Sequence, residues 1–328
     1  MTDNPTTIDA AIETPVENSL EYPMEASHEI VDDYVYLLNR TPLSSVLSFV
    51  KNRGHKGCQA DLGVVTDEWR QAQHYFRTLE QSEAGCADNP PITPLPEHLE
   101  PLRAELMKDP LIVNGFNRVP TDIAMVELDR IVVSQRHIDL RHVQMLKETL
   151  GPAPSDEQIF RTCLPANHPR PPFKWSRVHA NTYVFISPSN DLRFLGATPL
   201  ETDDLIGPRP GLIGVLGLQV GFGSNFLNLI FAENRLILHN GSHRAYAMRD
   251  LGITHVPAII QYTYSMDEVN EVAASSVAGK PYLYLREPRP PMLKDYFNPN
   301  LRKVVPVVRR NQQITVKFEV DSAYVPVL

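Results

Sequence analysis

The segment from Arg235 to Ile260 constrains the fold most, because it reads as a strand, a tight turn, a helix and a second strand. An apolar run at residues 236–238 ends in His239–Gly241, whose residue types tolerate a left-handed turn. A helix is predicted to begin at Ser242, which can cap it, and to stop at Gly252. The turn therefore presents free backbone amides at a helix N-terminus.

Such a terminus attracts anions, and His243 and Arg244 add side-chain donors in the same first turn. The guanidinium group of an arginine suits bidentate contact with phosphate oxygens, and a histidine is a donor whose charge can change near neutral pH. A phosphate group is the expected guest. The alternative is structural: Arg244 pairs with a nearby acid and His243 caps a strand end. The turn alone leaves both readings open.

The turn and the helix after it resemble the ParB/sulfiredoxin superfamily of nucleotide-binding domains, in which a strand ends in a glycine turn followed by His-Arg and an alanine-rich helix. Residues 125–150 resemble the opening of such a domain, with a strand, a Gln-Arg stretch and an amphipathic helix that Asp139 caps. The resemblance covers roughly residues 119–262 and includes an insertion. It implies an α+β fold with a ParB/sulfiredoxin-like core.

The resemblance also implies a site for ATP or CTP with Mg²⁺. In this superfamily the glycine turn holds the phosphates, the earlier polar stretch faces the nucleotide, and sulfiredoxins carry a phosphate-contacting lysine early in the first helix. Carried over by position, the nucleotide phosphate-binding residues are Gly241, Ser242, His243, Arg244, Gln135, Arg136 and His142.

Two departures narrow the function. Sulfiredoxin needs a nucleophilic cysteine in the turn, but Ser242 stands there and the cysteines lie at positions 58, 86 and 163, which argues against thiolate chemistry. Partition proteins carry a helix-turn-helix region after the nucleotide domain, whereas 66 residues follow Tyr262 here. Within them, residues 302–320 predict a hairpin around a polar turn at 309–313.

Charge and composition limit the partners. With 31 Lys+Arg against 39 Asp+Glu, the average surface repels a nucleic-acid backbone, so a small anionic ligand is favoured. We see no apolar run near the ~18 residues of a membrane span and no secretory leader, and the three cysteines have no paired short spacing. We therefore expect a cytoplasmic protein without a membrane partner or a metal centre.

The chain is predicted to comprise a flexible N-terminus (1–26), a helical subdomain (27–105), the nucleotide-binding domain with its insertion (106–265) and a β-rich C-terminal extension (266–328). Helices are expected near 30–38, 42–50 and 66–81, and a proline-rich linker at 88–102. In the insertion, residues 182–186 and 192–195 predict strands, and the glycine-spaced 211–224 predicts a bulged strand rather than a phosphate loop.

Four residues could serve as a general base by sequence distance: Asp129, Glu233, His239 and Asp250. Asp203 and Asp204 could hold magnesium or lie in a solvated loop, and residues 281–291 predict an extended arm packed across the core. The first function hypothesis is an NTPase or small-molecule kinase that hydrolyses the nucleotide or passes a phosphoryl group to a small acceptor. The alternative is a non-enzymatic, nucleotide-gated interaction module, associated with DNA as in partition. A nuclease is a third, weaker hypothesis.

Overall fold

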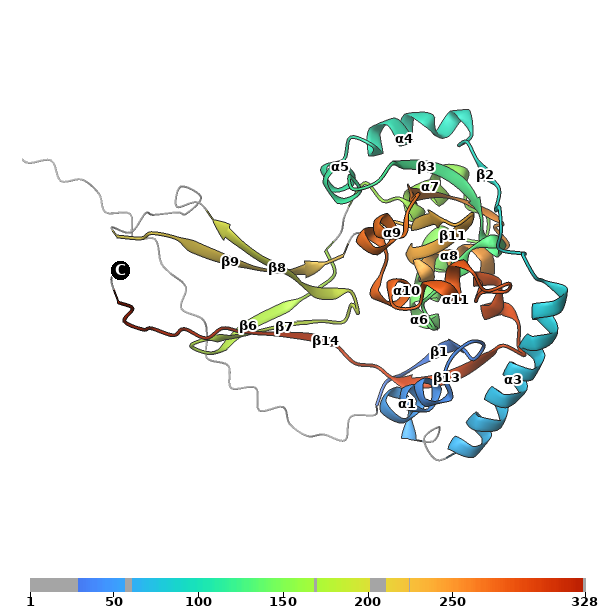
Figure 1. Cartoon of the computed structure of the whole chain (residues 1–328), viewed down its shortest axis with the longest axis horizontal. Coiled ribbons are helices and arrows are strands. Elements are labelled where there is room, and N and C mark those ends of the chain that lie inside the picture. The colour runs from blue at the N-terminus through green and yellow to red at the C-terminus, as the bar shows by residue number, and fades with distance from the viewer. Residues whose placement is uncertain (1–28, 57–60, 168–169, 201–210, 224, 327–328) are drawn as a thin grey trace, which may run out of the picture.

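The computed structural model describes residues 29–326 except 57–60, 168–169, 201–210 and 224. The chain is a mixed α+β protein, as the sequence predicts. A body of sheets and helices occupies one end of the molecule, and two β-ribbons project from it in the same direction (Figure 1). Among the described residues, no helix is long and apolar enough to cross a membrane.

A six-stranded sheet forms the centre of the body. In sheet order its strands are β2 (Ile92–Thr93), β3 (Thr121–Glu127), β12 (His255–Tyr262), β10 (Asn228–Ala232), β11 (Arg235–Asn240) and β4 (Val132–Val133). Only the β10–β12 and β11–β4 pairs are parallel. Strands β10 and β11 form a hairpin whose two loop residues, Glu233 and Asn234, both have positive φ, as a right-twisting two-residue turn requires.

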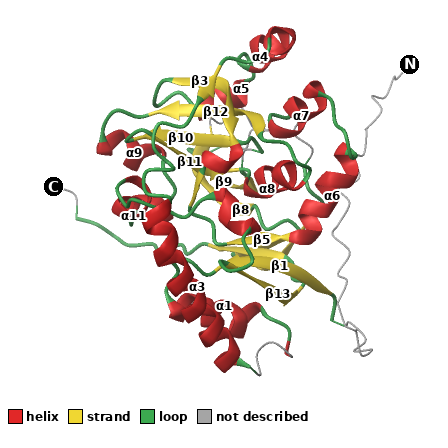
Figure 2. Cartoon of the chain, turned by 90° about the vertical axis from the view of Figure 1, so that its right-hand side faces the viewer, coloured by secondary structure: helices red, strands yellow, loops and turns green. Residues whose placement is uncertain are grey.

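Helices cover both faces of this sheet (Figure 2). On one face lie α6 (Leu140–Leu150), α7 (Asp156–Cys163) and α8 (Ser242–Asp250), and on the other lie α9 (Met266–Val272), α10 (Ser275–Ala278) and α11 (Pro281–Leu285). Strand β11 shows the reason: Leu236 and Leu238 belong to the first core and Ile237 to the second. Residues 281–285 are thus a helix rather than the predicted extended arm, although Tyr284 and Leu285 do pack into a core.

A second sheet joins the two ends of the described chain. Its strands are β13 (Arg302–Val308), β1 (Val31–Leu37) and β5 (His137–Asp139), in that order, and α1 (Leu43–Arg53) and α3 (Leu62–Ser82) pack on it. The helix predicted at 30–38 is wrong: β1 alternates, with Val35 and Leu37 in the central core and Tyr36 in the core under α1. Residues 27–105 are therefore neither wholly helical nor self-contained.

The remaining helices are short: η1 (Glu97–Leu99), α4 (Glu100–Leu106), α5 (Pro110–Gly115), η2 (Leu128–Arg130) and η4 (Leu293–Phe297). Because α9 to α11 and η4 precede β13, the C-terminal extension is only partly β-rich. The proline-rich stretch at 88–102 also contains more order than a linker, since β2, η1 and the start of α4 fall within it.

The ribbons come from the insertion and the C-terminal strand. One is the sheet β14–β7–β6, built from Gln312–Lys317, Thr182–Ser187 and Lys174–His179, and the other pairs β8 (Leu192–Leu200) with β9 (Val215–Phe222). The predicted hairpin of 302–320 does not form, because β13 pairs with β1 and β14 with β7, each over a full strand length. The strand predicted within residues 211–224 is confirmed as β9. The bulge predicted in it lies instead in its partner strand β8, where the register shifts.

Candidate functional site

The turn from β11 into α8 requires a glycine at its centre. Gly241 has φ +93°, in the left-handed region, and a Cβ added to it would lie 2.7 Å from Leu227 Cδ1 and 3.0 Å from Leu227 Cα. Gly241 rather than the predicted Ser242 is the N-cap, and no side chain caps the helix. The Gly241 amide donates to Asn240 Oδ1 at 2.8 Å. The tight packing against Leu227 thus requires a residue without a side chain at the N-cap, and such a residue does not cover the helix N-terminus.

The first turn of α8 offers backbone donors. The helix bonding begins with the Ala245 amide, which donates to the Gly241 carbonyl at 2.9 Å. The three amides before it, at positions 242–244, have no carbonyl within the helix four residues earlier to which they could donate. They lie at the partially positive end of the helix dipole. The local geometry predicted from the sequence is therefore present.

Arg244 is buried beside this turn without an acid. Its side chain is 8 % exposed, and its Nη2 donates to the amide oxygen of Asn225. Burial lowers the pKa of Arg244, and attraction to Cys163 and Asp191 does not offset it. No ion pair involving Arg244 is found within the described parts of the chain. The structural alternative, in which Arg244 pairs with a nearby carboxylate, thus finds no such partner among the described residues.

His243 is neutral in the free protein. The Asp139 backbone amide donates to His243 Nε2 at 3.1 Å, so this nitrogen carries a lone pair and no proton. Burial, followed by the neighbouring His142, His137 and Arg244, lowers the pKa of His243 to about 3. The expected change of charge near neutral pH does not occur here. The ring of His142 meets that of His243 edge-on, with centroids 5.1 Å apart, and burial lowers its pKa too.

These residues border a cavity of about 1240 Å³ between the body and the bases of the ribbons. Six of the seven predicted phosphate-binding residues line it: Gly241, Ser242, His243, Arg244, Gln135 and His142. Arg136 does not, because its guanidinium donates to the Asn39 carbonyl at 3.2 Å and to the Tyr284 hydroxyl at 3.4 Å. The assignment of Arg136 to the site is therefore corrected, since its side chain lies outside the cavity. Its neighbour Gln135 is in the cavity wall and donates to the His137 carbonyl.

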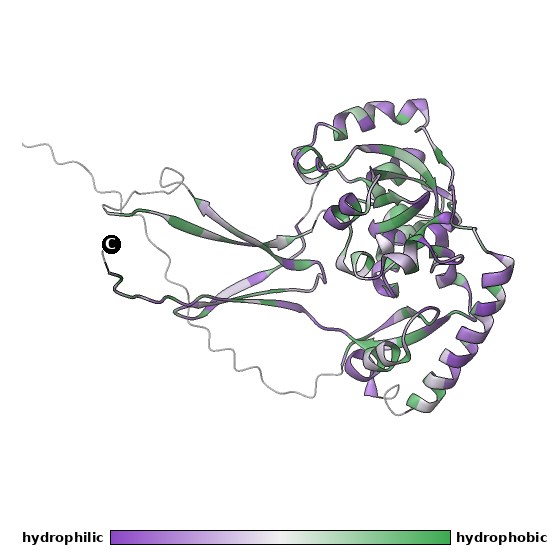
Figure 3. Cartoon of the chain, viewed as in Figure 1, coloured by the Kyte–Doolittle hydropathy of each residue, from purple (hydrophilic) through white to green (hydrophobic). Residues whose placement is uncertain are grey.

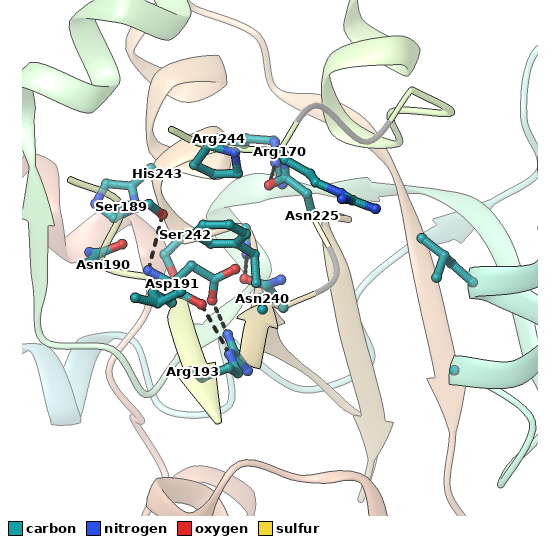
Figure 4. Close-up of a pocket in the computed structure, with 18 of the residues that line it drawn as sticks. Arg170, Ser189, Asn190, Asp191, Arg193, Asn225, Asn240, Ser242, His243 and Arg244 are labelled. Atoms are coloured by element: carbon teal, nitrogen blue, oxygen red, sulfur yellow. Dashed lines mark hydrogen bonds and ion pairs between the residues drawn. The ribbon is translucent and has the colours of Figure 1, made fainter. Parts of the chain in front are cut away.

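The structure adds polar residues that sequence reasoning missed. Arg170, Asp191, Arg193 and Asn225 line the same cavity, and Figure 4 shows them gathered around Ser242, His243 and Arg244. Asp191 and Arg193 form an ion pair with each other. All four belong to the insertion and its return to β10, where no motif marks them. Only the fold of the insertion onto the turn could have identified them.

Of the four candidate bases, His239 alone lines the cavity. The other three form ion pairs elsewhere: Asp129 with Arg249, Glu233 with Arg286 and Asp250 with Lys147. Burial lowers the pKa of His239, and Arg193 lowers it further. His239 is thus neutral at physiological pH, which a general base requires.

Metal or thiolate chemistry at this site would require a cluster of ligands or a reactive cysteine. Among the described residues, no group of three or more His, Cys, Asp or Glu side chains could hold a metal ion. Asp203 and Asp204 lie outside the described residues. Cys163 is near Arg244, but complete burial raises the pKa of its thiol to about 12, so it stays protonated at neutral pH.

An apolar wall completes the cavity. Phe173 and Phe185 contribute to it from one ribbon and its approach, and Val220 and Phe222 from the other.

No protein-family model matches the chain, and no curated protein or solved structure shows significant similarity to it. The geometry and charge of this cavity are therefore the basis on which a function can be proposed.

Proposed function

We propose that this protein binds a nucleoside triphosphate, with its phosphates on the Gly241–Arg244 turn, in a domain related to the ParB/sulfiredoxin superfamily. The observation that carries the proposal is Arg244, a buried guanidinium that faces a large cavity and has an amide oxygen in place of a carboxylate partner. A buried charge without a counterion is costly, and a bound phosphate would supply that counterion.

The charge of the cavity supports an anionic ligand. Among the described residues, three arginines line it, at positions 170, 193 and 244, against one carboxylate, Asp191, which pairs with Arg193. The whole chain, in contrast, has a formal net charge of −8. A cationic cavity in an acidic protein selects a compact anion that can enter it over an extended polyanion such as a nucleic acid.

The apolar wall supports a ligand with an organic part beyond its phosphates. Small-molecule sites typically occupy roughly 300–1,000 Å³, so a cavity of about 1240 Å³ has room for more than a phosphate group. Phe173, Phe185 and Phe222 offer apolar surface to a base or sugar. A nucleotide meets both requirements at once.

The first form of this function is an enzyme that hydrolyses the nucleotide or passes a phosphoryl group to a small acceptor. Arg244 and the α8 amides would stabilise charge on the phosphoryl oxygens, and His239 would accept a proton from the nucleophile. Among the described residues that line the cavity, Asp191 is the carboxylate, and it would hold a Mg²⁺ ion brought by the phosphates only by giving up its ion pair with Arg193.

The second form is a nucleotide-gated interaction module. The hydrogen bond from the Asp139 amide to His243 joins the phosphate turn to β5, and β5 belongs to the sheet that contains β1 and β13. A ligand on the turn would therefore act on the link between the two sheets of the body. Partner binding could respond to the nucleotide through that link.

Calorimetric titration with ATP, CTP, GTP, UTP and inorganic tripolyphosphate, each with and without Mg²⁺, tests the proposal. We expect at least one nucleotide to bind, and Arg244→Ala to weaken it by about 1.5–3 kcal/mol, because a charge-assisted contact is lost. Arg136→Ala is the matched control, since Arg136 lies outside the cavity. If neither a nucleotide nor tripolyphosphate binds at millimolar concentration, the proposal is wrong. If a nucleotide does bind, release of phosphate or formation of a phosphorylated product identifies the enzyme, and the absence of both identifies the interaction module.

A further inference from the structure

The β8–β9 ribbon has one face that is wholly apolar. Residues opposite each other in a two-stranded ribbon share a face, and residues two apart along a strand return to it. On β9 this face carries Leu216, Leu218, Val220 and Phe222. Their partners in register on β8 are Pro199, Ala197, Phe194 and Leu192. No polar or charged side chain interrupts the face.

The opposite face of the same ribbon is different. It carries Thr198 and Gln219, whose side chains bond to each other at 3.1 Å, and Arg193, which pairs with Asp191. It also carries Gly217 and Gly221, which Leu200 and Leu195 cover, and Leu200 pairs there with Val215. This face is therefore mixed in character, whereas the first is wholly apolar, and Figure 3 shows both strands as largely hydrophobic.

The second ribbon has a largely apolar face too. The register of β6, β7 and β14 places Trp175, Tyr183, Phe185, Ile314 and Val316 on one face. Arg177 shares this face, and its guanidinium lies over the Tyr183 ring, 5.9 Å from the centroid. Trp175 packs beside Phe185 and Tyr183, with ring centroids 6.3 and 6.4 Å apart. Phe185 lines the cavity from this ribbon, and Val220 and Phe222 line it from the other. At their bases, the apolar faces of both ribbons thus border the same space.

Farther from the body these faces are uncovered. Leu216 is 63 % exposed, Trp175 59 % and Phe194 48 %, and Ile213 near the tip is fully exposed. A two-stranded ribbon with an exposed apolar face is at best marginally stable in water by itself, and exposed patches beyond a few hundred Å² mark interaction sites.

We propose that the two ribbons form a dimerisation surface, on which the apolar faces of one copy of this chain pack against the same faces of a second copy. The exposed parts of these side chains present on the order of 800 Å² per copy, about the area per partner that a standard stable interface buries. The face on β8–β9 contains no charge, so packing it against its own copy leaves no ion unpaired. Sheets stack in this way at a spacing of about 10 Å.

The mass of the full chain in solution tests the proposal. Light scattering during gel filtration should give twice the 37.0 kDa of one chain. Leu216→Asp and Phe194→Asp place a charge on the apolar face and should raise the dimer dissociation constant more than a hundredfold, which gives a monomer at micromolar concentration. Thr198→Asp and Gln219→Asp place the same charge on the opposite face of the same strands and should leave the dimer intact.

Several outcomes would overturn it. A monomeric wild-type chain does so, and if that monomer sediments with vesicles of phosphatidylcholine and phosphatidylglycerol, the apolar faces belong to a lipid surface instead. A dimer that survives both apolar-face substitutions also overturns it. Circular dichroism and the unfolding midpoint verify that each variant is folded, which is expected because these side chains lie outside the three buried cores. The measurement needs no nucleotide, so its result is independent of the proposed nucleotide site.

Discussion

Two buried arginines in this protein have opposite surroundings. Arg289 is 1 % exposed and donates to both oxygens of Asp295, at 2.5 and 3.0 Å, and to Glu83 at 3.0 Å. Arg244 is almost as buried but reaches only an amide oxygen in the described structure. Burial acts to lower the pKa of both arginines. At Arg289 the carboxylate partners outweigh burial, so its pKa lies above the ordinary value, whereas the pKa of Arg244 lies below it.

The difference in partners fits a structural role for Arg289 and the binding role proposed for Arg244. Asp295 is itself 1 % exposed and also accepts from Asn39 at 2.8 Å and from the Met292 amide at 2.9 Å. Around Arg289 every charge is met inside the protein, and the cluster ties η4 to α3 and to the end of β1. Around Arg244 no described carboxylate meets the charge, and under the proposed function a bound anion would do so. In this protein the buried arginine that stabilises the fold thus carries its own acid, whereas the arginine proposed to bind an anion has none among the described residues.

The largest effect should come from breaking the complete cluster. Asp295→Asn leaves the Arg289 guanidinium buried with one carboxylate fewer, so the free energy of unfolding should fall by about 3–5 kcal/mol. Urea denaturation measures it. Asp129→Asn is the control, because Asp129 meets Arg249 in a partly exposed pair that is worth under about 1 kcal/mol. A loss below about 1 kcal/mol at Asp295 would contradict the structural role of the cluster.

The next effect concerns the backbone that places Arg244. Gly241→Ala forces a side chain into the left-handed region and against Leu227, so we expect a loss of about 1–3 kcal/mol in the free energy of unfolding. Nucleotide binding should weaken in parallel. Gly252→Ala is the matched control: it also has positive φ, but no atom lies within 4 Å of the added Cβ. Its cost should be only the roughly 1–2 kcal/mol of the backbone conformation.

The two regions should also respond to acid at different pH values. The pKa of His243 drops from 6.5 to about 3 in the folded chain, so below pH 6.5 the unfolded chain binds a proton that the folded chain does not. Stability should therefore fall as pH decreases from 6.5 towards 3, by up to about 1.4 kcal/mol per pH unit. At Glu83 burial raises the pKa, but Lys294 and Arg289 outweigh it, so that region loses stability only below pH 4.5.

A bound anion should reverse the first trend, because a phosphate beside His243 favours its protonated form. Tripolyphosphate should stabilise the chain more at pH 5.5 than at pH 7.5, and calorimetry in buffers of different ionisation enthalpy should show proton uptake on binding. Thermal unfolding across this pH range measures the effect, and His243→Gln should flatten it. Equal stabilisation at both pH values would exclude His243 from the anion site.

The smallest change in stability is expected at Arg244 itself. Arg244→Met removes a buried charge that has no carboxylate partner, so the free energy of unfolding without ligand should change by less than about 1 kcal/mol, or rise. Arg289→Met should instead cost several times more, because it leaves the buried Asp295 unpaired. Comparable losses at the two positions would show that Arg244 is also structural.

Some of this was predictable from the residues because it is local. The strand at 236–238, the turn at Gly241, the helix after it and the Asp139 cap each depend on neighbours within a few positions. Helix α3 was predictable for the same reason, since its apolar side chains recur along one face. These elements determined that a set of amides and an arginine would stand at one helix terminus.

Tertiary structure decided what those groups do. Residues 31–37 resemble an amphipathic helix, but pairing with residues 302–308 makes them a strand, and no local pattern reveals a partner so far along the chain. The same long-range pairing separates β13 from β14 and brings the ribbons over the phosphate turn. The burial of Arg244 and the lack of a described carboxylate beside it follow from that arrangement. Packing between distant segments sets which residues surround a side chain. Local sequence, in contrast, determines only the turn and the helix that carry Arg244.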